Sequence, residues 1–349
     1  MTIPTTYLGA LMLALLTMVC WGSWANTTKM TGKWRFELFY FDFSFGVLVC
    51  AVVAAFTFGM WGDSVNFIDN ASIASRKNLG IAVFAGGVFN LANMLLVAAI
   101  TVAGMAVAFP VGIGLALVIG VVWSYLLRPA GNPVLLFGGA AVVVLAIIVA
   151  SMAHRAIQDA RVLAPIVDRS GRSRPAPRPS ATKGIALSLV SGTLMGSFFP
   201  LIQIARKDDL EVGPYVLALC FATGVFLSTP LFNMYFMSLP VQGQPVKLKR
   251  YLEGTARQHL LGVAGGVIWC VGGVANFVAA ATPESVQVGP AISYALGQGA
   301  TLVSTLWGLL VWKEFADASP RANTLIRGSV GLYLAGLALI SIAPLFVKS

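Results

Sequence analysis

Charged residues are scarce in this sequence. Only 10% of the 349 residues are charged, and 58% are hydrophobic, whereas a soluble globular protein carries roughly 25% charged residues. This composition excludes an ordinary water-soluble fold. Apolar runs of about 18–20 residues mark helices that cross a hydrocarbon layer roughly 30 Å thick. The chain has about ten such runs, so we predict an all-α membrane protein.

Residues that usually hold metals or carry catalysis are also few. The two histidines, His154 and His259, are far apart and lack metal-type spacing, and the four cysteines all fall inside apolar runs. Buried cysteines usually act as small core residues, and histidines at helix ends are expected to be solvated. Spans with so few polar groups cannot bring a Ser-His-Asp set together. The sequence therefore predicts no metal, no cofactor and no enzymatic activity.

The N-terminal segment MTIPTTYLGA lacks the positively charged region of a cleaved signal peptide. We therefore expect residues 7–25 to form the first helix of the mature protein. A net charge of +10 can indicate nucleic-acid binding. In a membrane protein it more often reflects cytoplasmic loops that face anionic lipid, so we expect no nucleic-acid partner.

Ten apolar segments are predicted to span the bilayer, and a basic linker divides them. The linker, 155–183, contains RSGRSRPAPRPSATK and is expected to be flexible. We predict a first five-helix unit over 1–154 and a second over 184–349. The predicted spans are 7–25, 38–61, 78–101, 104–127, 133–154, 184–204, 213–237, 258–281, 286–312 and 323–346.

Loop charges predict the orientation. Cytoplasmic loops are enriched in Lys and Arg, and most of the 23 basic residues fall on one side if the N-terminus faces outward. We therefore predict that both termini lie outside and that the linker is cytoplasmic. The expected location is the plasma (inner) membrane, crossed many times.

Short motifs recur in the same order in the two halves. Gly22-Ser23-Trp24 matches Gly196-Ser197-Phe198, FGV (45–47) matches TGV (223–225), and AGGV occurs at 85–88 and 264–267. Pro110 matches Pro290, and the segment 135–153 aligns with 325–343. Each half has an odd number of helices, so the second enters the membrane from the opposite side. Inverted repeats of this kind are typical of secondary transporters, which hold the solute near the midplane.

The two matched prolines, Pro110 and Pro290, predict helix kinks. Proline inside a span removes a backbone hydrogen bond, and the small residues nearby let carbonyl groups line a cavity. A kink that serves packing alone is the alternative.

Three acidic residues are candidates for proton coupling, because ionisable groups inside spans are costly and usually functional. Asp42 lies within FYFDFSF, where burial among aromatic rings disfavours the charged carboxylate and suits proton exchange near neutral pH. It could instead pair with Lys29 or Lys33. Glu37 lies nearer water, and Glu284 could simply favour a helix N-terminus.

Neutral polar and aromatic side chains inside the spans are the candidate solute-binding groups. Amides both donate and accept hydrogen bonds, and indole rings can stack on a planar solute or a sugar face. Hydrogen bonds between helices and interfacial anchoring are the competing roles. The candidates are Trp21, Asn90, Asn93, Gln203, Trp269, Asn276, Ser293, Tyr294 and Gln298.

Several motifs carry a family resemblance that covers the whole chain. WGS (21–23) followed by Lys29 resembles the glucose/ribose/rhamnose porter branch of the drug/metabolite transporter superfamily. FELFYFDFSFG (36–46) and STLWGLLVWKEFADASPR (304–321) are similar to ureide permeases. The central linker is shorter than in plant ureide permeases and has no G-x4-G-K-[ST] phosphate loop, which argues against an ATP-driven pump.

The resemblance implies ten helices in two inverted five-helix repeats and uphill uptake of a small polar solute, proton-coupled. Sugars and ureide or nucleobase compounds are the expected solute classes. An exporter of drugs or amino acids and a non-transporting receptor are the alternatives. A homodimer is the assembly we would look for.

Overall fold

The computed structural model is built almost entirely of helices. It describes residues 1–32, 34–62, 65–103, 105–163, 166–167, 173–174, 181–206, 212–240, 244–283, 286, 288–313 and 319–346. Nine helical segments in this part of the chain are long and apolar enough to cross a membrane, and a further apolar helix, Val111–Leu127, is shorter. The prediction of an all-α membrane protein is confirmed.

The elements of the first half follow the predicted spans closely. They are α1 (Tyr7–Ser23), α2 (Asn26–Met30), α3 (Phe36–Phe56), α4 (Phe67–Ile73), α5 (Arg76–Ala103), α6 (Met105–Leu127) and α7 (Pro133–Leu163). Between the halves, β1 (Ile166–Val167) pairs antiparallel with β2 (Ser173–Arg174).

The second half contains the remaining helices. They are α8 (Ala181–Ala205), α9 (Pro214–Ser238), α10 (Lys249–Leu252), α11 (Ala256–Ala280), α12 (Pro290–Gln298), α13 (Ala300–Leu306), a π-helical turn (Trp307–Val311), α14 (Pro320–Ile342) and a final 3-10 turn (Ala343–Phe346). The predicted linker 155–183 is shorter than expected, because α7 continues to Leu163 and α8 begins at Ala181.

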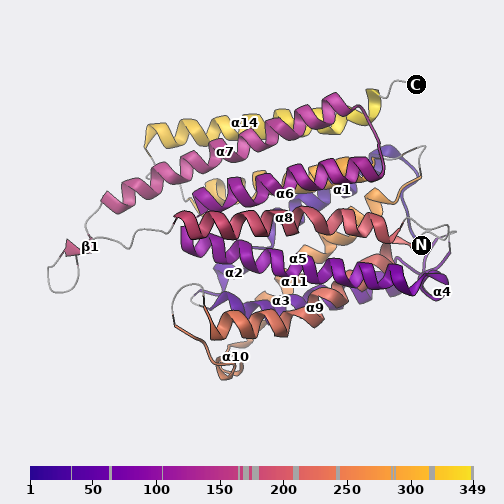
Figure 1. Cartoon of the computed structure of the whole chain (residues 1–349), viewed down its shortest axis with the longest axis horizontal. Coiled ribbons are helices and arrows are strands. Elements are labelled where there is room, and N and C mark those ends of the chain that lie inside the picture. Colours follow the sequence, from indigo (N-terminus) through magenta and orange to yellow (C-terminus); the bar gives the residue numbers. More distant parts are fainter. Residues whose placement is uncertain are drawn as a thin grey trace.

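The long helices run side by side, and their connections lie at two ends. Figure 1 shows both chain termini and α4 at one end, and β1 and α10 at the opposite end. We call these the termini end and the linker end. The two termini thus lie at the same end of the helical bundle.

Helices of the first half pack mainly on helices of the second. α5 lies against α8 and α9, α3 against α11 and α9, α1 against α11 and α12, α6 against α8, and α7 against α14. The two predicted five-helix units are therefore interdigitated rather than two separate bodies.

Glycines set the closest of these contacts. A Cβ atom on any of four glycines would collide with a backbone carbonyl oxygen of the facing helix: Gly46 on Val263, Gly224 on Val83, Gly266 on Phe43 and Gly86 on Phe221. Lipid gives helices no hydrophobic driving force to associate, so small residues that allow close backbone approach stabilise the bundle.

One predicted span is interrupted. We predicted a span over 286–312 with a kink at Pro290. The span is found over Pro290–Val311, but the kink at Pro290 is wrong. Pro290 lies in the first turn of α12, a position at which proline is compatible with a helix. It follows Gly289, which has a φ of 81°. The interruption falls instead at Gly299, between α12 and α13. Pro110 lies within α6, and its kink remains a prediction.

Two prolines that we did not single out do lie inside helices. Pro200 is inside α8 and Pro230 is inside α9. Each removes one backbone hydrogen bond from its helix.

Candidate functional site

A cavity of about 150 Å³ lies among α1, α5, α6, α8, α11, α12 and α13. Its walls are aromatic and small apolar residues with a few neutral polar side chains. The lining residues are Trp21, Trp24, Ala25, Phe89, Asn93, Leu96, Ile113, Met195, Phe198, Trp269, Gly297, Gln298, Ala300, Thr301 and Ser304. None of these residues carries a charge, so the described cavity suits a neutral solute.

Trp269 is the centre of the aromatic wall. Its ring is stacked on Trp21, with centroids 5.7 Å apart and planes at 10°, and on Phe221 behind it, at 5.9 Å and 16°. Phe89 lies 4.5 Å from the Trp269 ring. The indole Nε1 of Trp21 donates a hydrogen bond to the Trp269 carbonyl oxygen at 3.2 Å. This hydrogen bond fixes the orientation of the Trp21 indole.

The polar groups of the cavity present mainly hydrogen-bond acceptors. Asn93 donates one N–H of Nδ2 to the Tyr40 hydroxyl at 3.1 Å, which leaves its carbonyl Oδ1 and one N–H for a solute. Thr301 and Ser304 donate their hydroxyl protons to the carbonyls of Gln298 and Gly22, at 3.1 and 2.9 Å. Their remaining lone pairs can accept only, and the Thr301 hydroxyl also shares a side-chain hydrogen bond with Tyr333.

Gln298 supplies both a donor and an acceptor. Its side chain has no hydrogen-bond partner among the described residues, and it lines the cavity at the last residue of α12. The helix is interrupted at the next residue, Gly299, whose N–H donates to the Leu296 carbonyl. Interrupted spans at a solute site are a recurring feature of secondary transporters.

The structure separates the nine predicted binding residues into two groups. Four of them line the cavity: Trp21, Asn93, Trp269 and Gln298. The other five are not among its lining residues: Asn90, Gln203, Asn276, Ser293 and Tyr294.

Most of this second group joins helices to one another. Asn90 donates to the Val225 carbonyl and to the hydroxyls of Ser228 and Thr229 on α9. Tyr294 donates to carbonyls of α6 and α8. Such bonds are the competing role that the sequence left open.

Five cavity residues that matter chemically were not among the predicted binding residues: Trp24, Phe89, Phe198, Thr301 and Ser304. A signal existed for two of them, because Thr301 and Ser304 follow Gln298 at intervals of three, roughly one helical turn. The aromatic residues could not be distinguished from ordinary core residues without the structure.

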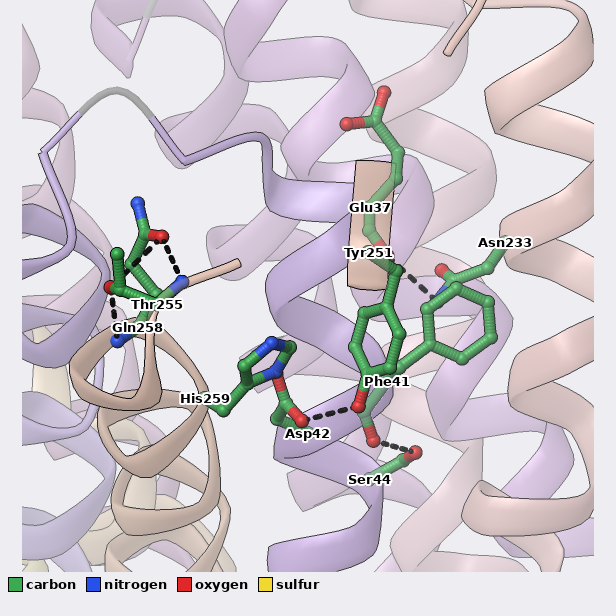
Figure 2. Close-up of polar contacts among 9 residues, drawn as sticks. All are labelled: Glu37, Phe41, Asp42, Ser44, Asn233, Tyr251, Thr255, Gln258 and His259. Carbon is green, nitrogen blue, oxygen red and sulfur yellow. Dashed lines mark hydrogen bonds and ion pairs between the residues drawn. The ribbon is translucent and has the colours of Figure 1, made fainter. Parts of the chain in front are cut away.

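A second polar cluster lies at the linker end, around Asp42 (Figure 2). The hydroxyl of Tyr251 donates to Asp42 Oδ1 at 2.6 Å, and His259 Nδ1 lies 2.8 Å from Oδ2. The side chain of Asp42 is 7% exposed and that of His259 is 27% exposed. Asp42 is therefore buried, while His259 reaches the surface beside it.

The structure gives Asp42 a partner that the sequence did not predict. Asp42 contacts His259 rather than Lys29, whose ammonium lies over the Trp312 ring at 5.2 Å. Lys33, the other predicted partner, lies outside the described residues. The sequence suggested that His259 is a separate solvated residue, but the structure pairs it with Asp42. Burial and the Asp42 carboxylate raise the pKa of Tyr251, so its hydroxyl stays protonated and keeps donating at physiological pH.

The other two acidic candidates are placed differently. Glu37 receives two hydrogen bonds from the Arg35 guanidinium, at 3.0 and 2.5 Å, and this local ion pair accounts for its charge. Glu284 lies outside the described residues.

The first helix and the interrupted span are tied together at the linker end. Trp307 donates its indole N–H to Ser23 at 2.9 Å, and Trp312 donates to Asn26 at 2.6 Å. Ser23 at the end of α1 and Asn26 at the start of α2 therefore hold the end of the span that carries Thr301 and Ser304.

Comparison with known proteins gives one family over nearly the whole chain. A family model described as ureide permease matches residues 39–165 and 172–343. Ureide permease 2 of Arabidopsis thaliana is 24% identical, with 95% of this chain and 96% of the relative covered. Ureide permease 1 of the same plant is 23% identical, with 95% of each chain covered. A solved crystal structure with 17% identity covers 97% of this chain and 99% of its own, with a TM-score of 0.63, and shares the fold.

Proposed function

The chain belongs to the ureide permease family, and from this premise we propose that it is a secondary transporter that takes up a neutral ureide-type compound together with protons. Membership confirms the resemblance seen in the sequence and makes the protein a multi-pass membrane transporter rather than an enzyme. The observation that carries the proposal is the uncharged aromatic cavity whose polar groups mainly accept hydrogen bonds.

The cavity favours N–H-rich solutes over sugars. A cyclic ureide is planar, which suits the stacked indoles of Trp21 and Trp269, and its N–H groups would donate to Asn93 and Thr301. A sugar hydroxyl can fill the same positions, but a sugar ring is not flat and cannot lie with its whole surface against an indole face. An anion would find no positive charge among the lining residues.

Asp42 is the proposed proton-coupling group. It is buried, and the titratable groups that face it are Tyr251 of α10 and His259 of α11. On its own helix, the nearest acid, Glu37, is already paired with Arg35. His259 is partly exposed at the linker end, so a proton can pass between water and the carboxyl through the imidazole.

Asp42 is connected to the cavity through aromatic rings. The neighbouring residue, Phe43, lies 4.8 Å from Trp24 and 6.4 Å from Trp269, centroid to centroid. Protonation of Asp42 weakens its attraction to His259 and so loosens α3 against α11. That change would reach the cavity through Phe43.

We further propose that all ten long helices cross the membrane as two inverted repeats. Gly46 of the first half contacts Val263 of the second, and the equivalent contact with the halves exchanged is that of Gly224 with Val83. Likewise, the contact of Gly266 with Phe43 is equivalent to that of Gly86 with Phe221. In these pairs Gly86 corresponds to Gly266, so the two AGGV motifs are offset by one residue from direct alignment.

The repeated Gly-Ser motif gives further support. Gly22 packs against Ala300 and Val303, and Gly196 packs against Ala116 and Ile119. Both glycines thus face a small residue and, three positions later, a β-branched one on the fourth helix of the opposite half. The motif recurs because the same close packing is needed twice.

The orientation follows from the charges at the linker end. We propose that this end is cytoplasmic, in the plasma (inner) membrane, with both termini outside. Asp42 then faces the cytoplasm, the side at which an importer releases its protons. Alternating access between the two faces is part of the same proposal.

Thermal stability of the purified protein tests the solute class. Hydantoin, a planar cyclic ureide, should raise the melting temperature, because a ligand at 100 times its dissociation constant stabilises by about 2.7 kcal/mol. The matched control is 1,3-dimethylhydantoin, which keeps the ring and loses both N–H donors. An equal shift with the dimethyl compound, or a shift with glucose alone, would overturn the proposed solute class.

A further inference from the structure

Three buried amide atoms near the termini end have no hydrogen-bond partner. Both polar atoms of the Gln203 side chain are buried and unpartnered, and so is Oδ1 of Asn276. A buried polar atom without a partner costs about 1–3 kcal/mol, so each such atom needs an explanation. Neither residue lines the central cavity.

Two contacts between α8 and α11 place these amides in the same layer. The Phe199 ring lies 6.1 Å from Phe277, and Arg206 donates to the Ala280 carbonyl at 3.1 Å. Gln203 lies four residues after Phe199 and three before Arg206, on one face of the chain.

Asn276 lies beside the same contacts on α11. It directly precedes Phe277 and lies four residues before Ala280. Its Nδ2 is held by the Ser293 carbonyl of α12 at 3.0 Å, which leaves Oδ1 as the unused group.

Aromatic rings separate this layer from the central cavity. Tyr294 is stacked on Phe199 at 5.2 Å, and Phe198 of the cavity wall lies 6.0 Å from the same tyrosine. The Tyr294 hydroxyl donates to the carbonyls of Ala116 and Met195, at 3.3 and 3.2 Å. These bonds tie α12 to α6 and α8 and close the termini end.

The central cavity extends toward the linker end. Trp24 and Ala25 line it beyond the last residue of α1, whereas no residue of the Gln203 layer reaches it. The described conformation is thus closed at the termini end.

We infer that Gln203 and Asn276 form a second hydrogen-bonding subsite for the solute, buried in this conformation and occupied when the termini end opens. In the open conformation the amides meet water or the N–H and C=O groups of a ureide passing to the central cavity. In the closed conformation these atoms have no partner, and the loss of their hydrogen bonds raises the free energy of that conformation. The inference rests on the proposed function, because it assigns the subsite to the same solute.

The first test replaces the amide with an apolar group of similar shape. Gln203→Met removes the unpartnered atoms, so the melting temperature should stay equal or rise. The hydantoin-induced thermal shift, which reports the central cavity, should remain, while hydantoin exchange into proteoliposomes should fall at least about fivefold, a barrier change near 1 kcal/mol. Unchanged exchange would show that the solute does not use the amide, and a variant that no longer folds would show that the amide has a structural role; either result overturns the inference.

The second test does not depend on the solute. Gln203→Cys should react with a membrane-impermeant thiol reagent added from the termini side, because opening exposes the position to water. The matched control is Ser188→Cys on the same helix, a buried position against Gly112, which should stay unlabelled. Absence of labelling at 203 in protein that transports would refute the subsite. A missing hydantoin shift in the unmodified protein would instead refute the proposed solute.

Discussion

Asp42 and His259 meet at 2.8 Å between Oδ2 and Nδ1, although 217 residues separate them in the chain. One lies on α3 and the other on α11, so the contact joins a helix of the first half to one of the second. A group that gains or loses a proton at this contact changes the attraction between the halves. Proton coupling and helix movement can therefore share a single pair of side chains.

Asp42→Asn tests this coupling. Asparagine keeps the shape and the hydrogen bond from Tyr251 but cannot exchange a proton. We expect accumulation of solute driven by a pH gradient to be lost, while exchange of labelled for unlabelled solute continues. Equal loss of both activities would mean that Asp42 binds solute or holds the fold.

Tyr251→Phe tests the pH dependence. The tyrosine donates to Asp42 Oδ1, and a hydrogen bond to a charged group is worth about 1.5–3 kcal/mol. Without this donor the carboxylate is less favoured, so protonation occurs at higher pH. The midpoint of the transport–pH profile should therefore rise by about one pH unit or more, since one unit corresponds to 1.36 kcal/mol. An unchanged or lowered midpoint would contradict the role given to Asp42.

Asn93→Leu and Asn90→Leu form a matched pair on α5. Asn93 lines the cavity, so its loss should weaken hydantoin binding about tenfold, the effect of about 1.4 kcal/mol, and it should also lower the melting temperature, because the buried Tyr40 hydroxyl loses its partner. Asn90 bonds to α9, so its loss should lower the melting temperature and leave the dissociation constant near that of the unmodified protein. Thermal unfolding with and without hydantoin measures both. The assignment of the cavity fails if the two variants exchange their effects on the dissociation constant.

Glycine substitutions test the packing. Alanine at Gly46 would place Cβ against the Val263 carbonyl, and such overpacking costs about 1–3 kcal/mol. Gly224→Ala, the equivalent change in the second half, should lower the melting temperature by a similar amount. Gly80→Ala on α5 is the control, because a Cβ there meets nothing within 4 Å. A large difference between the first two variants would argue against equivalent halves.

Orientation can be measured with single cysteines at exposed positions of the two ends. Lys249→Cys in α10 should resist an impermeant thiol reagent in intact cells, and Asp69→Cys in α4 should react with it. The reverse pattern would place the linker end outside.

The spans were predictable because each needs only length and low charge, which the sequence shows directly. The packing faces of α3 and α9 were visible as FGV and TGV, since close approach requires glycine at a fixed position. Asp42 was identifiable because a carboxyl inside an apolar run is rare. Its partner was not, because nothing in the local sequence relates His259 to a helix 217 residues away.

The cavity was predictable only in part. Amides inside spans were correct candidates, but Asn93 and Asn90 share one helical face and differ only in what faces them. The interruption at Gly299 was not predicted, because proline is the stronger sequence signal for a helix break. Pro290, however, lies in the first turn of a helix, where proline does not disturb the backbone hydrogen bonds. Tertiary contacts decide both questions.

The interruption at Gly299 divides the binding groups between two helices, α12 and α13. Gln298 belongs to α12, which Tyr294 ties to the termini end, whereas Thr301 and Ser304 belong to the segment held by Ser23 and Asn26. A movement that opens the termini end would carry the glutamine away while the two hydroxyls stay in place. The solute would then lose part of its hydrogen bonding at the moment the path opens, so its affinity would differ between the two faces of the membrane.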